Sequence, residues 1–187
     1  MFDKKIILGS ASPRRADILK MAGVAFDVYS ADVNEIIKEN LSPEAVTIDI
    51  AQQKMQAIKS KFPTDIILTS DTVVVLKDEI LGKPIGVAGA KAMLQKISGN
   101  MHEVITGVVL AQGDKEKTFS VTTKVYFKSL SNSDIDFYIE NYQPFDKAGS
   151  YAIQEFIGAI GIEKIEGDYY NVVGLPVSKV VEELRNW

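Results

Sequence analysis

The sequence predicts an α/β or α+β fold built on a mixed β-sheet flanked by helices. Predicted strands and helices interleave without strict alternation over the 187 residues, which is typical of a mixed sheet. Residues 65–76 form an apolar, β-branched run expected of a central strand, and two long strands of a hairpin are expected at 101–112 and 117–128. With 46% hydrophobic residues the chain can bury a full core, so we expect a single domain over residues 1–187.

The other elements follow from periodicity and from residues that start or stop helices. Ile6, Ile7 and Leu8 indicate a buried strand near 5–9, and Ser12 followed by Pro13 favours a helix near 13–22. We next expect a strand near 25–30, a polar loop through Asn40 and a helix from Ser42-Pro43-Glu44 to about Lys61. After the central strand we expect a turn at 77–79 with a short return strand, and helices near 87–97 and 132–141. The chain is then expected to form a strand near 159–165, a loop at 167–176 and a final helix to about Arg185.

Composition excludes several classes of function. The net charge of −4 argues against binding nucleic acid or an anionic membrane, since both reward a basic surface. The sequence has no signal peptide and no apolar run of about 18 residues, so we expect a soluble, cytoplasmic protein. With no cysteine and a single histidine, His102, thiolate and multi-histidine metal sites are ruled out. A metal would be held by carboxylates and phosphate oxygens, which favours Mg²⁺ or Mn²⁺.

Two arginines begin the helix predicted at 13–22, where cations are disfavoured unless an anion is present. Arg14 and Arg15, together with the hydroxyls of Ser10 and Ser12, therefore resemble a phosphate cradle. The alternative is a capped surface helix in which Arg14 pairs with Asp17. The residues alone leave both interpretations open.

Asp71 is the only charged residue between Ile66 and Leu76 of the predicted central strand, and it is flanked by Ser70 and Thr72. A carboxylate there is costly unless it is paired, hydrogen-bonded or metal-bound, as catalytic and metal-binding acids are. The alternative is a side chain bonded to a neighbouring loop at a bend of the strand.

Lys54 is predicted to lie within the apolar face of its helix. At about 100° per residue, it shares an arc with Thr47, Ile50, Ala51, Met55 and Ile58. A lone lysine there can extend its ammonium to water. Beside Asp71 and an anion site, it is equally a candidate phosphate ligand or partner of the acid.

Three further polar residues gain interest from their position. Lys83 follows the return strand between Gly82 and Pro84, Glu35 lies in the polar loop after residues 25–30, and Gln154 offers both a donor and an acceptor suited to a base edge. Taken alone, each is better interpreted as an ordinary solvated or loop side chain, and only its position relative to the other signals makes it a candidate. His102 is interpreted as structural or as a hydrogen-bond donor to a loop.

Several short motifs, in the right order over essentially the whole chain, closely resemble the Maf family of nucleoside triphosphate pyrophosphatases. The matching segments are Ser10-Ala11-Ser12-Pro13-Arg14-Arg15, Asn34-Glu35, Lys54, Ser70-Asp71-Thr72-Val73-Val74, Gly82-Lys83-Pro84, Ser98-Gly99 with His102 and Thr106-Gly107-Val108, Asp146-Lys147-Ala148-Gly149, Ile153-Gln154 and the run from Gly167 to Pro176. The chain departs from the family pattern at Asn34, Gly86, Gln143, Ala152, Glu155 and Phe156.

The resemblance implies an elongated fold like that of the inosine triphosphate pyrophosphatases (Maf/Ham1), with two lobes around a nucleotide cleft. It implies that Asp71 activates water, that Glu35 and Asp71 take part in binding a divalent metal, and that phosphates are bound by Ser10, Arg15, Lys54, Lys83 and, through the metal, Glu35. It also implies the dTTP/UTP branch, which is recognised by three residues found here as Arg14, Thr72 and Gln154.

The expected activity is hydrolysis of dTTP and UTP to the nucleoside monophosphate and pyrophosphate, with modified pyrimidine nucleotides as possible further substrates. An alternative from another class is a nucleotide-binding regulator of septum formation and cell division without important turnover. The resemblance further implies a homodimer that binds a nucleoside triphosphate. From the net charge we expect neither nucleic acid nor a membrane as a partner.

Overall fold

The computed structural model describes residues 4–38 and 40–187. Their contacts cluster into two compact units. The first comprises residues up to Thr72, Thr106–Val121 and Gly174–Trp187, and the second comprises Val73–Ile105 and Thr122–Val173. The expectation of a single domain over residues 1–187 stays a prediction.

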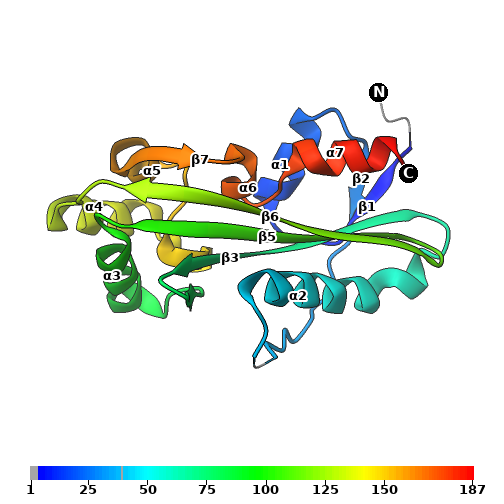
Figure 1. Cartoon of the computed structure of the whole chain (residues 1–187), viewed down its shortest axis with the longest axis horizontal. Helices are drawn as coiled ribbons and strands as arrows, with labels where there is room; N and C mark the ends of the chain where they lie inside the picture. The colour runs from blue at the N-terminus through cyan, green and yellow to red at the C-terminus, as the bar shows by residue number, and fades with distance from the viewer. Residues whose placement is uncertain (1–3, 39) are drawn as a thin grey trace. The chain divides into compact units, whose positions relative to one another are not determined.

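The secondary structure alternates between strands and helices as expected (Figure 1). In chain order the elements are β1 (Ile6–Leu8), α1 (Pro13–Met21), β2 (Phe26–Val28), α2 (Pro43–Ile58), η1 (Lys59–Lys61), β3 (Ile66–Leu76), β4 (Glu79–Leu81), α3 (Gly86–Ile97), β5 (Met101–Gln112), β6 (Lys115–Phe127), α4 (Asn132–Tyr142), η2 (Pro144–Asp146), η3 (Ala148–Ser150), α5 (Phe156–Gly161), β7 (Ile162–Glu166), α6 (Tyr169–Val173) and α7 (Val177–Arg185).

The strands form one mixed sheet of seven strands in the order β2-β1-β3-β5-β6-β7, with β4 paired to β3. β1 is parallel to both β2 and β3, whereas β3–β4 and β6–β7 are antiparallel. The predicted mixed sheet is therefore confirmed. β3, β5 and β6 each contribute residues to both units.

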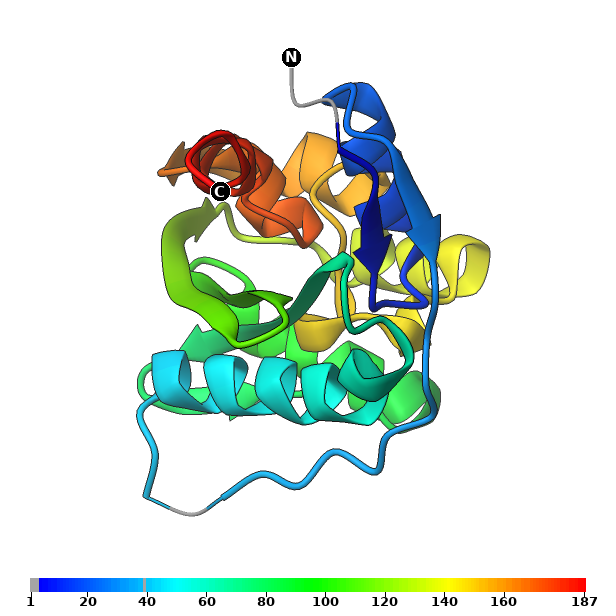
Figure 2. The same ribbon diagram turned by 90° about the vertical axis from the view of Figure 1, so that its right-hand side faces the viewer.

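In the first unit, α2 covers one face of the strands, while α1 and α7 lie on the opposite face (Figures 1 and 2). The apolar stripe predicted for the helix from residue 43 is confirmed, because its buried residues include Thr47, Ile50, Ala51, Met55 and Ile58. The core on this side of the sheet consists of Ile7, Ala51, Met55, Ile58, Ile67, Val109 and Ala111. Burial of this stripe stabilises α2 more than its intrinsic helix propensity does.

Gly107 on β5 lets the backbone of α2 approach the sheet closely. A Cβ atom at this position would lie 2.5 Å from the carbonyl carbon of Thr47 and 2.6 Å from the amide nitrogen of Ile48. Both atoms belong to the helix backbone and cannot rotate away. The sequence thus sets the distance between α2 and the strands by omitting one side chain.

The second unit has its own core. Its buried side chains come mainly from β3, β5, β6, α3, α4 and the segment before α5, and Tyr138 is the largest that is fully buried. His102 on β5 is 1% exposed, with its Nε2 atom 2.7 Å from the hydroxyl of Tyr151. This agrees with the expectation that His102 is structural and bonds a loop residue.

Two expectations near the C-terminus are wrong. Residues 159–161, expected to begin a strand, belong to α5, and only Ile162–Glu166 form β7. A short apolar run does not distinguish strand from helix by its pattern, and residues 156–161 form the helix α5, whose Ile157 is buried in the core of this unit.

The expected loop at 167–176 contains the helix α6. Contacts from distant strands hold it, because the buried Asn171 side chain donates from Nδ2 to the carbonyl of Val104 and to Oγ1 of Thr123, both at 3.0 Å. Thr123 also bonds the backbone of Asp168, just before the helix. Nothing local in the sequence signals these partners.

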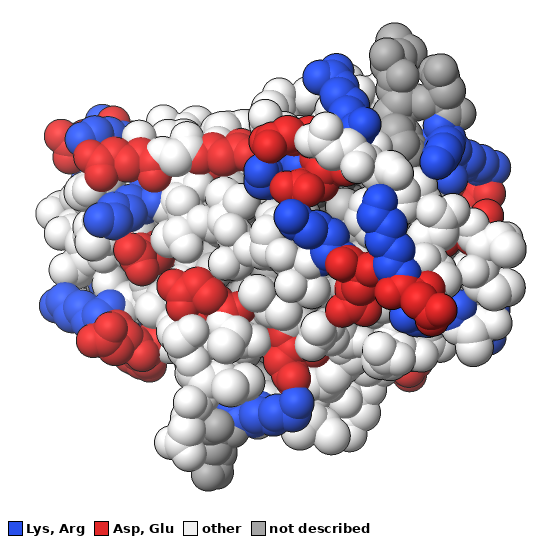
Figure 3. All heavy atoms as spheres, turned by 45° about the vertical axis from the view of Figure 1, so that its right-hand side comes forward, with Lys and Arg blue, Asp and Glu red and all other residues white. Residues whose placement is uncertain are grey.

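Acidic and basic side chains are interspersed on the face shown in Figure 3, as expected for a small negative net charge. None of the helices within residues 4–38 and 40–187 is long and apolar enough to cross a bilayer.

Candidate functional site

The polar residues of β3 face two different helices of the first unit. Side chains alternate across a strand, so Thr69 and Asp71 face α2, where Thr69 Oγ1 donates to the carbonyl of Ala51 at 2.7 Å. Thr72 projects to the other face and accepts a hydrogen bond from Arg15 on α1 at 3.1 Å. β3 therefore places the Asp71 carboxylate toward α2 and the Thr72 hydroxyl toward α1.

Lys54 joins two carboxylates. Its Nζ atom lies 2.6 Å from Oδ1 of Asp71 and 3.0 Å from Oε1 of Glu35. The side chains of Lys54 and Asp71 are 18% and 14% exposed, whereas that of Glu35 is 43% exposed. Of the alternatives for Lys54, the structure contains the partner of the acid, and its role as a phosphate ligand stays a prediction.

Arg15 is buried, and most of its donors bond the protein. Its Nε donates to the carbonyl of Gly174 at 2.9 Å, and Nη1 donates to Oγ of Ser10 at 3.1 Å and to the carbonyl of Ser70 at 2.8 Å. With the bond from Nη2 to Thr72, four of the five N–H donors of the guanidinium are used. Burial lowers the pKa of Arg15, and the negative charge of Asp71 partly offsets this effect.

The residues of the expected phosphate cradle lie together at the start of α1, and their binding of phosphate stays a prediction. α1 begins at Pro13 with Ser12 as its N-cap residue, as predicted, but the Ser12 side chain makes no capping bond. Instead the backbone N–H of Ser12 donates to Oγ of Ser10 at 3.3 Å. Ser10 thus accepts from both Ser12 and Arg15 and keeps its own hydroxyl proton to donate. Arg14 is half-buried in the first turn of α1.

Thr72 belongs to a set of hydroxyls and carbonyls around the Arg15 guanidinium. Its Oγ1 atom lies 2.9 Å from Oγ1 of Thr106 and 3.4 Å from the carbonyl oxygen of Gly174. The sequence interpretation included Thr72 but missed the contribution of Thr106 and of the Gly174 carbonyl. A backbone carbonyl carries no side-chain signal, so no pattern in the chain could have identified it.

Lys83 and Gln154 lie in the second unit. Lys83 is exposed in the segment between β4 and α3, and Gln154 is exposed in the turn before α5. Their predicted roles toward substrate stay predictions. Next to Gln154, the carboxylate of Glu155 accepts a hydrogen bond from Tyr138 at 2.5 Å and lies 3.5 Å from Nζ of the buried Lys147. These contacts tie the turn to α4.

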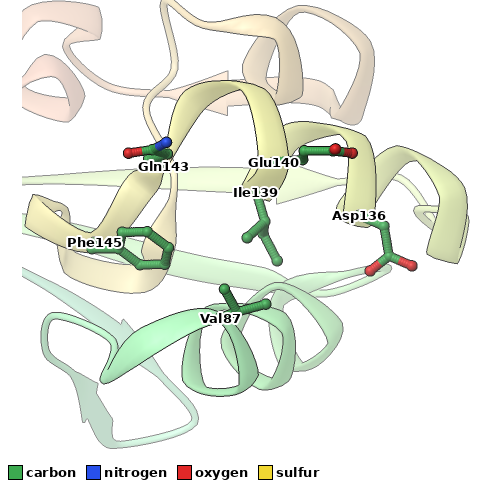
Figure 4. A pocket seen from close by; sticks show the side chains of 6 residues that line it. All are labelled: Val87, Asp136, Ile139, Glu140, Gln143 and Phe145. Carbon is green, nitrogen blue, oxygen red and sulfur yellow. The ribbon is translucent and has the colours of Figure 1, made fainter.

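A pocket in the second unit lies between the start of α3 and the end of α4 (Figure 4). It is lined by Val87, Asp136, Ile139, Glu140, Gln143 and Phe145. None of these is a residue expected to bind substrate, and the pocket does not contribute to the site around Asp71.

Asp71 and Glu35 are the residues expected to bind a divalent metal, and carboxylate oxygens are ligands suited to Mg²⁺. One oxygen of each carboxylate lies within 3.0 Å of the Lys54 ammonium, and their role as metal ligands stays a prediction. Within residues 4–38 and 40–187 no group of three or more His, Asp or Glu side chains gathers to hold an ion alone. Mg²⁺ is commonly held by one or two carboxylates, with phosphate oxygens and water completing its octahedron, so two carboxylates are a sufficient protein contribution.

Comparison with known proteins places the chain in a family. A family model described as "Maf-like protein" matches residues 5–187. A dTTP/UTP pyrophosphatase of Cytophaga hutchinsonii is 48% identical over 180 residues, which is 96% of this chain and 83% of that protein. A dTTP/UTP pyrophosphatase of Bacillus cereus is 46% identical over 184 residues, 98% of this chain and 90% of that protein.

Among solved structures, a HAM1 protein from Coxiella burnetii is similar with a TM-score of 0.50 at 12% sequence identity, over 98% of this chain and 100% of that one. At this identity the likeness concerns the fold alone. It confirms the Ham1-like fold class that the sequence predicts.

Proposed function

Because the chain belongs to the family of Maf-like proteins, we propose that it hydrolyses dTTP and UTP to the nucleoside monophosphate and pyrophosphate. The names of relatives that are 46% and 48% identical over nearly its whole length support this activity. The structural observation that carries the proposal is the contact of Lys54 with both Asp71 and Glu35. It joins a candidate base, a cation and a second acid.

Asp71 is the proposed general base. Its Oδ1 atom accepts from Lys54, and in the described part of the chain this bond leaves Oδ2 to accept a proton from water. The water oxygen forms a bond to the α-phosphorus, the bond from that phosphorus to the α–β bridging oxygen breaks, and pyrophosphate leaves with the bonding electron pair. The proton of the water passes to the Asp71 carboxylate, so atoms and charges balance.

Lys54 and Arg15 support this chemistry in different ways. Lys54 keeps the Asp71 carboxylate oriented and places a positive charge beside the reacting phosphate. Arg15, through Ser10, Ser70 and Thr72, holds the ends of the elements that carry the site. The proposal also includes Lys83 as a phosphate ligand. It assigns substrate specificity to Arg14, Thr72 and Gln154.

The charges around Asp71 support a metal requirement. Lys54 and Arg15 carry two positive charges, and Asp71 and Glu35 carry two negative ones, so these four side chains together are formally neutral. A strongly anionic triphosphate therefore needs further positive charge. When bound by Glu35 and Asp71, Mg²⁺ or Mn²⁺ would offset the charge of the phosphate oxygens.

We also propose that the protein acts in the cytoplasm as a homodimer on free nucleotides, without nucleic acid or membrane partners. The net charge of −4 supports the last point, since nucleic acids and anionic membranes attract basic surfaces. Light scattering of the purified protein tests the homodimer.

The activity is tested by measuring pyrophosphate release from dTTP, UTP, CTP, dATP, GTP and 7-methyl-GTP with Mg²⁺ or Mn²⁺. We expect turnover of dTTP and UTP that is lost in Asp71→Asn and kept in Asp65→Asn, an exposed acid just before β3. Tight binding of nucleotide by the wild-type protein without release of pyrophosphate would instead favour the regulatory alternative.

A further inference from the structure

Glu35 lies on a segment that has no regular secondary structure. Between β2 and α2 the described residues form no helix or strand, yet the Glu35 carboxylate is placed 3.0 Å from Nζ of Lys54. The side chains of Ile36 and Ile37 beside it are both 62% exposed. Apolar burial therefore does not hold this part of the segment, and its position depends on polar contacts.

Gln53 supplies those contacts. Its Oε1 atom accepts a hydrogen bond from the backbone N–H of Ile36 at 3.0 Å, and its Nε2 atom donates to the backbone carbonyl of Ile36 at 2.8 Å. One side-chain amide thus satisfies both backbone groups of a single residue. Gln53 precedes Lys54 in α2, and Ile36 follows Glu35, so the two pairs lie side by side.

The orientation of the Gln53 amide follows from its third bond. Nε2 also donates to Oδ2 of Asp49, one turn earlier in α2, at 2.7 Å. An ionised carboxylate can only accept, so the NH₂ group must face Asp49, and both of its hydrogens are then used. Hydrogen bonds from Lys38 and Gln53 lower the pKa of Asp49.

Lys38 provides a second contact between this segment and α2. Its ammonium pairs with the other oxygen of Asp49. The segment is therefore held to α2 at two points on either side of Ile37: at Ile36 by Gln53 and at Lys38 by Asp49.

We infer that Gln53 is a positioning residue that docks the backbone of Ile36 on α2 and thereby places Glu35 beside Lys54 and Asp71. This inference rests on the proposed function for its effect on catalysis. Without Gln53 the Glu35 carboxylate loses its fixed distance from Lys54, and the pair of carboxylates proposed to hold the metal loses its geometry. Removing residues that orient metal ligands typically costs about 10- to 100-fold in metal affinity or activity.

The test compares Gln53→Ala and Gln53→Glu with the matched control Gln52→Ala. Gln52 is the preceding residue of the same helix and is also half-buried, and its side chain bonds the surface residue Glu116 at 3.3 Å. In Gln53→Glu, an ionised carboxylate can still accept from the N–H of Ile36 but cannot donate to its carbonyl or to Asp49. We expect both Gln53 variants to lower kcat/KM for dTTP by about 10- to 100-fold, with a higher Mg²⁺ concentration for half-maximal rate, and Gln52→Ala to match wild type.

Two further measurements separate positioning from a general structural effect. In a Glu35→Gln background, Gln53→Ala is expected to cause little additional loss, because the residue that it positions is already disabled. Backbone amide exchange at residues 35–38, measured without metal or nucleotide, is expected to be faster in Gln53→Ala and unchanged in Gln52→Ala.

Three outcomes overturn the inference. The first is a kcat/KM of Gln53→Ala equal to that of Gln52→Ala, and the second is an undiminished further loss of activity when Gln53→Ala is added to Glu35→Gln. The third is an unchanged rate of amide exchange at Ile36 in Gln53→Ala. An inactive wild-type protein would instead refute the proposed function, and the amide exchange would still decide whether Gln53 holds the segment.

Discussion

Arg15 and Thr72 are joined by a hydrogen bond of 3.1 Å from Nη2 to Oγ1. Arg15 is an expected phosphate ligand and Thr72 an expected determinant of base preference. Arg15 lies near the start of the chain, and Thr72 ends the first segment of this unit. The same guanidinium also donates to the carbonyls of Ser70 and Gly174. A substitution of Arg15 therefore removes a contact to β3 at the residue that precedes Asp71.

Replacing Arg15 by Lys is expected to lower both stability and turnover. A lysine has a single ammonium group and cannot reproduce the planar fork that reaches Ser10, Ser70, Thr72 and Gly174. Leaving one buried carbonyl without a donor costs about 1–3 kcal/mol, measurable as a fall in the free energy of unfolding in urea. Arg14→Lys, in the same turn, is the control and is expected to leave the free energy of unfolding within about 0.5 kcal/mol of wild type.

Lys54→Met is expected to reduce kcat by about 10²–10³-fold, the usual cost of removing one electrostatic contact to a reacting group. Met retains the length of the stem but leaves the carboxylates of Asp71 and Glu35 without a shared cation. Steady-state pyrophosphate release from dTTP measures the effect. A similar loss in Lys59→Met, just past the end of α2, would show that the effect is not specific to the site.

Gly107→Ala is expected to destabilise the protein by about 1–3 kcal/mol, the usual cost of overpacking. Its Cβ would meet the backbone of α2 at Thr47, 2.5 Å away, and the displaced helix would carry Lys54 away from Asp71. Urea unfolding and turnover report the two effects. Gly89→Ala in α3 is the contrast, since its Cβ finds neighbours only at 3.7 Å; a loss of stability there equal to that in Gly107→Ala would contradict the argument.

The stability of the protein is expected to fall as the pH drops below about 6.5, the ordinary pKa of histidine. Burial lowers the pKa of His102 to about 4, so between these values the unfolded chain binds a proton that the folded protein does not. The stabilising effect is complete above the unfolded pKa and is lost as the pH falls toward the folded one, with a slope of at most about 1.4 kcal/mol per pH unit.

Urea unfolding from pH 5 to pH 8 measures this dependence. Because His102 is the only histidine, His102→Gln should flatten the curve between pH 5.5 and 6.5. An unchanged slope in that variant would assign the pH dependence to other groups.

Chelation by EDTA is expected to abolish pyrophosphate release, and Mg²⁺ is expected to restore it. Glu35→Gln should need a higher Mg²⁺ concentration for half-maximal rate, because it removes one of two carboxylates proposed to hold the ion. Full turnover in EDTA would exclude a metal requirement.

Local patterns were sufficient where the deciding interaction lies within one element. The period of the helix placed Lys54 among the buried residues of α2, and the apolar run around Asp71 identified it as a carboxylate that needs a partner; both follow from the sequence because side-chain direction repeats along a helix or strand. Pro13 likewise marks the first residue of α1, since a missing N–H costs nothing at that position.

Tertiary structure decided the remainder, because the partners are distant in the chain or belong to the backbone. That Lys54 meets Glu35 as well as Asp71, that Gln53 binds Ile36, and that α6 is a helix all depend on contacts between separate elements. The acceptors of Arg15 at Ser70 and Gly174 are main-chain carbonyls, a group that every residue carries. Side-chain chemistry and periodicity along the chain thus indicate which residues need a partner, whereas the partner that each one meets follows from the packing of distant elements.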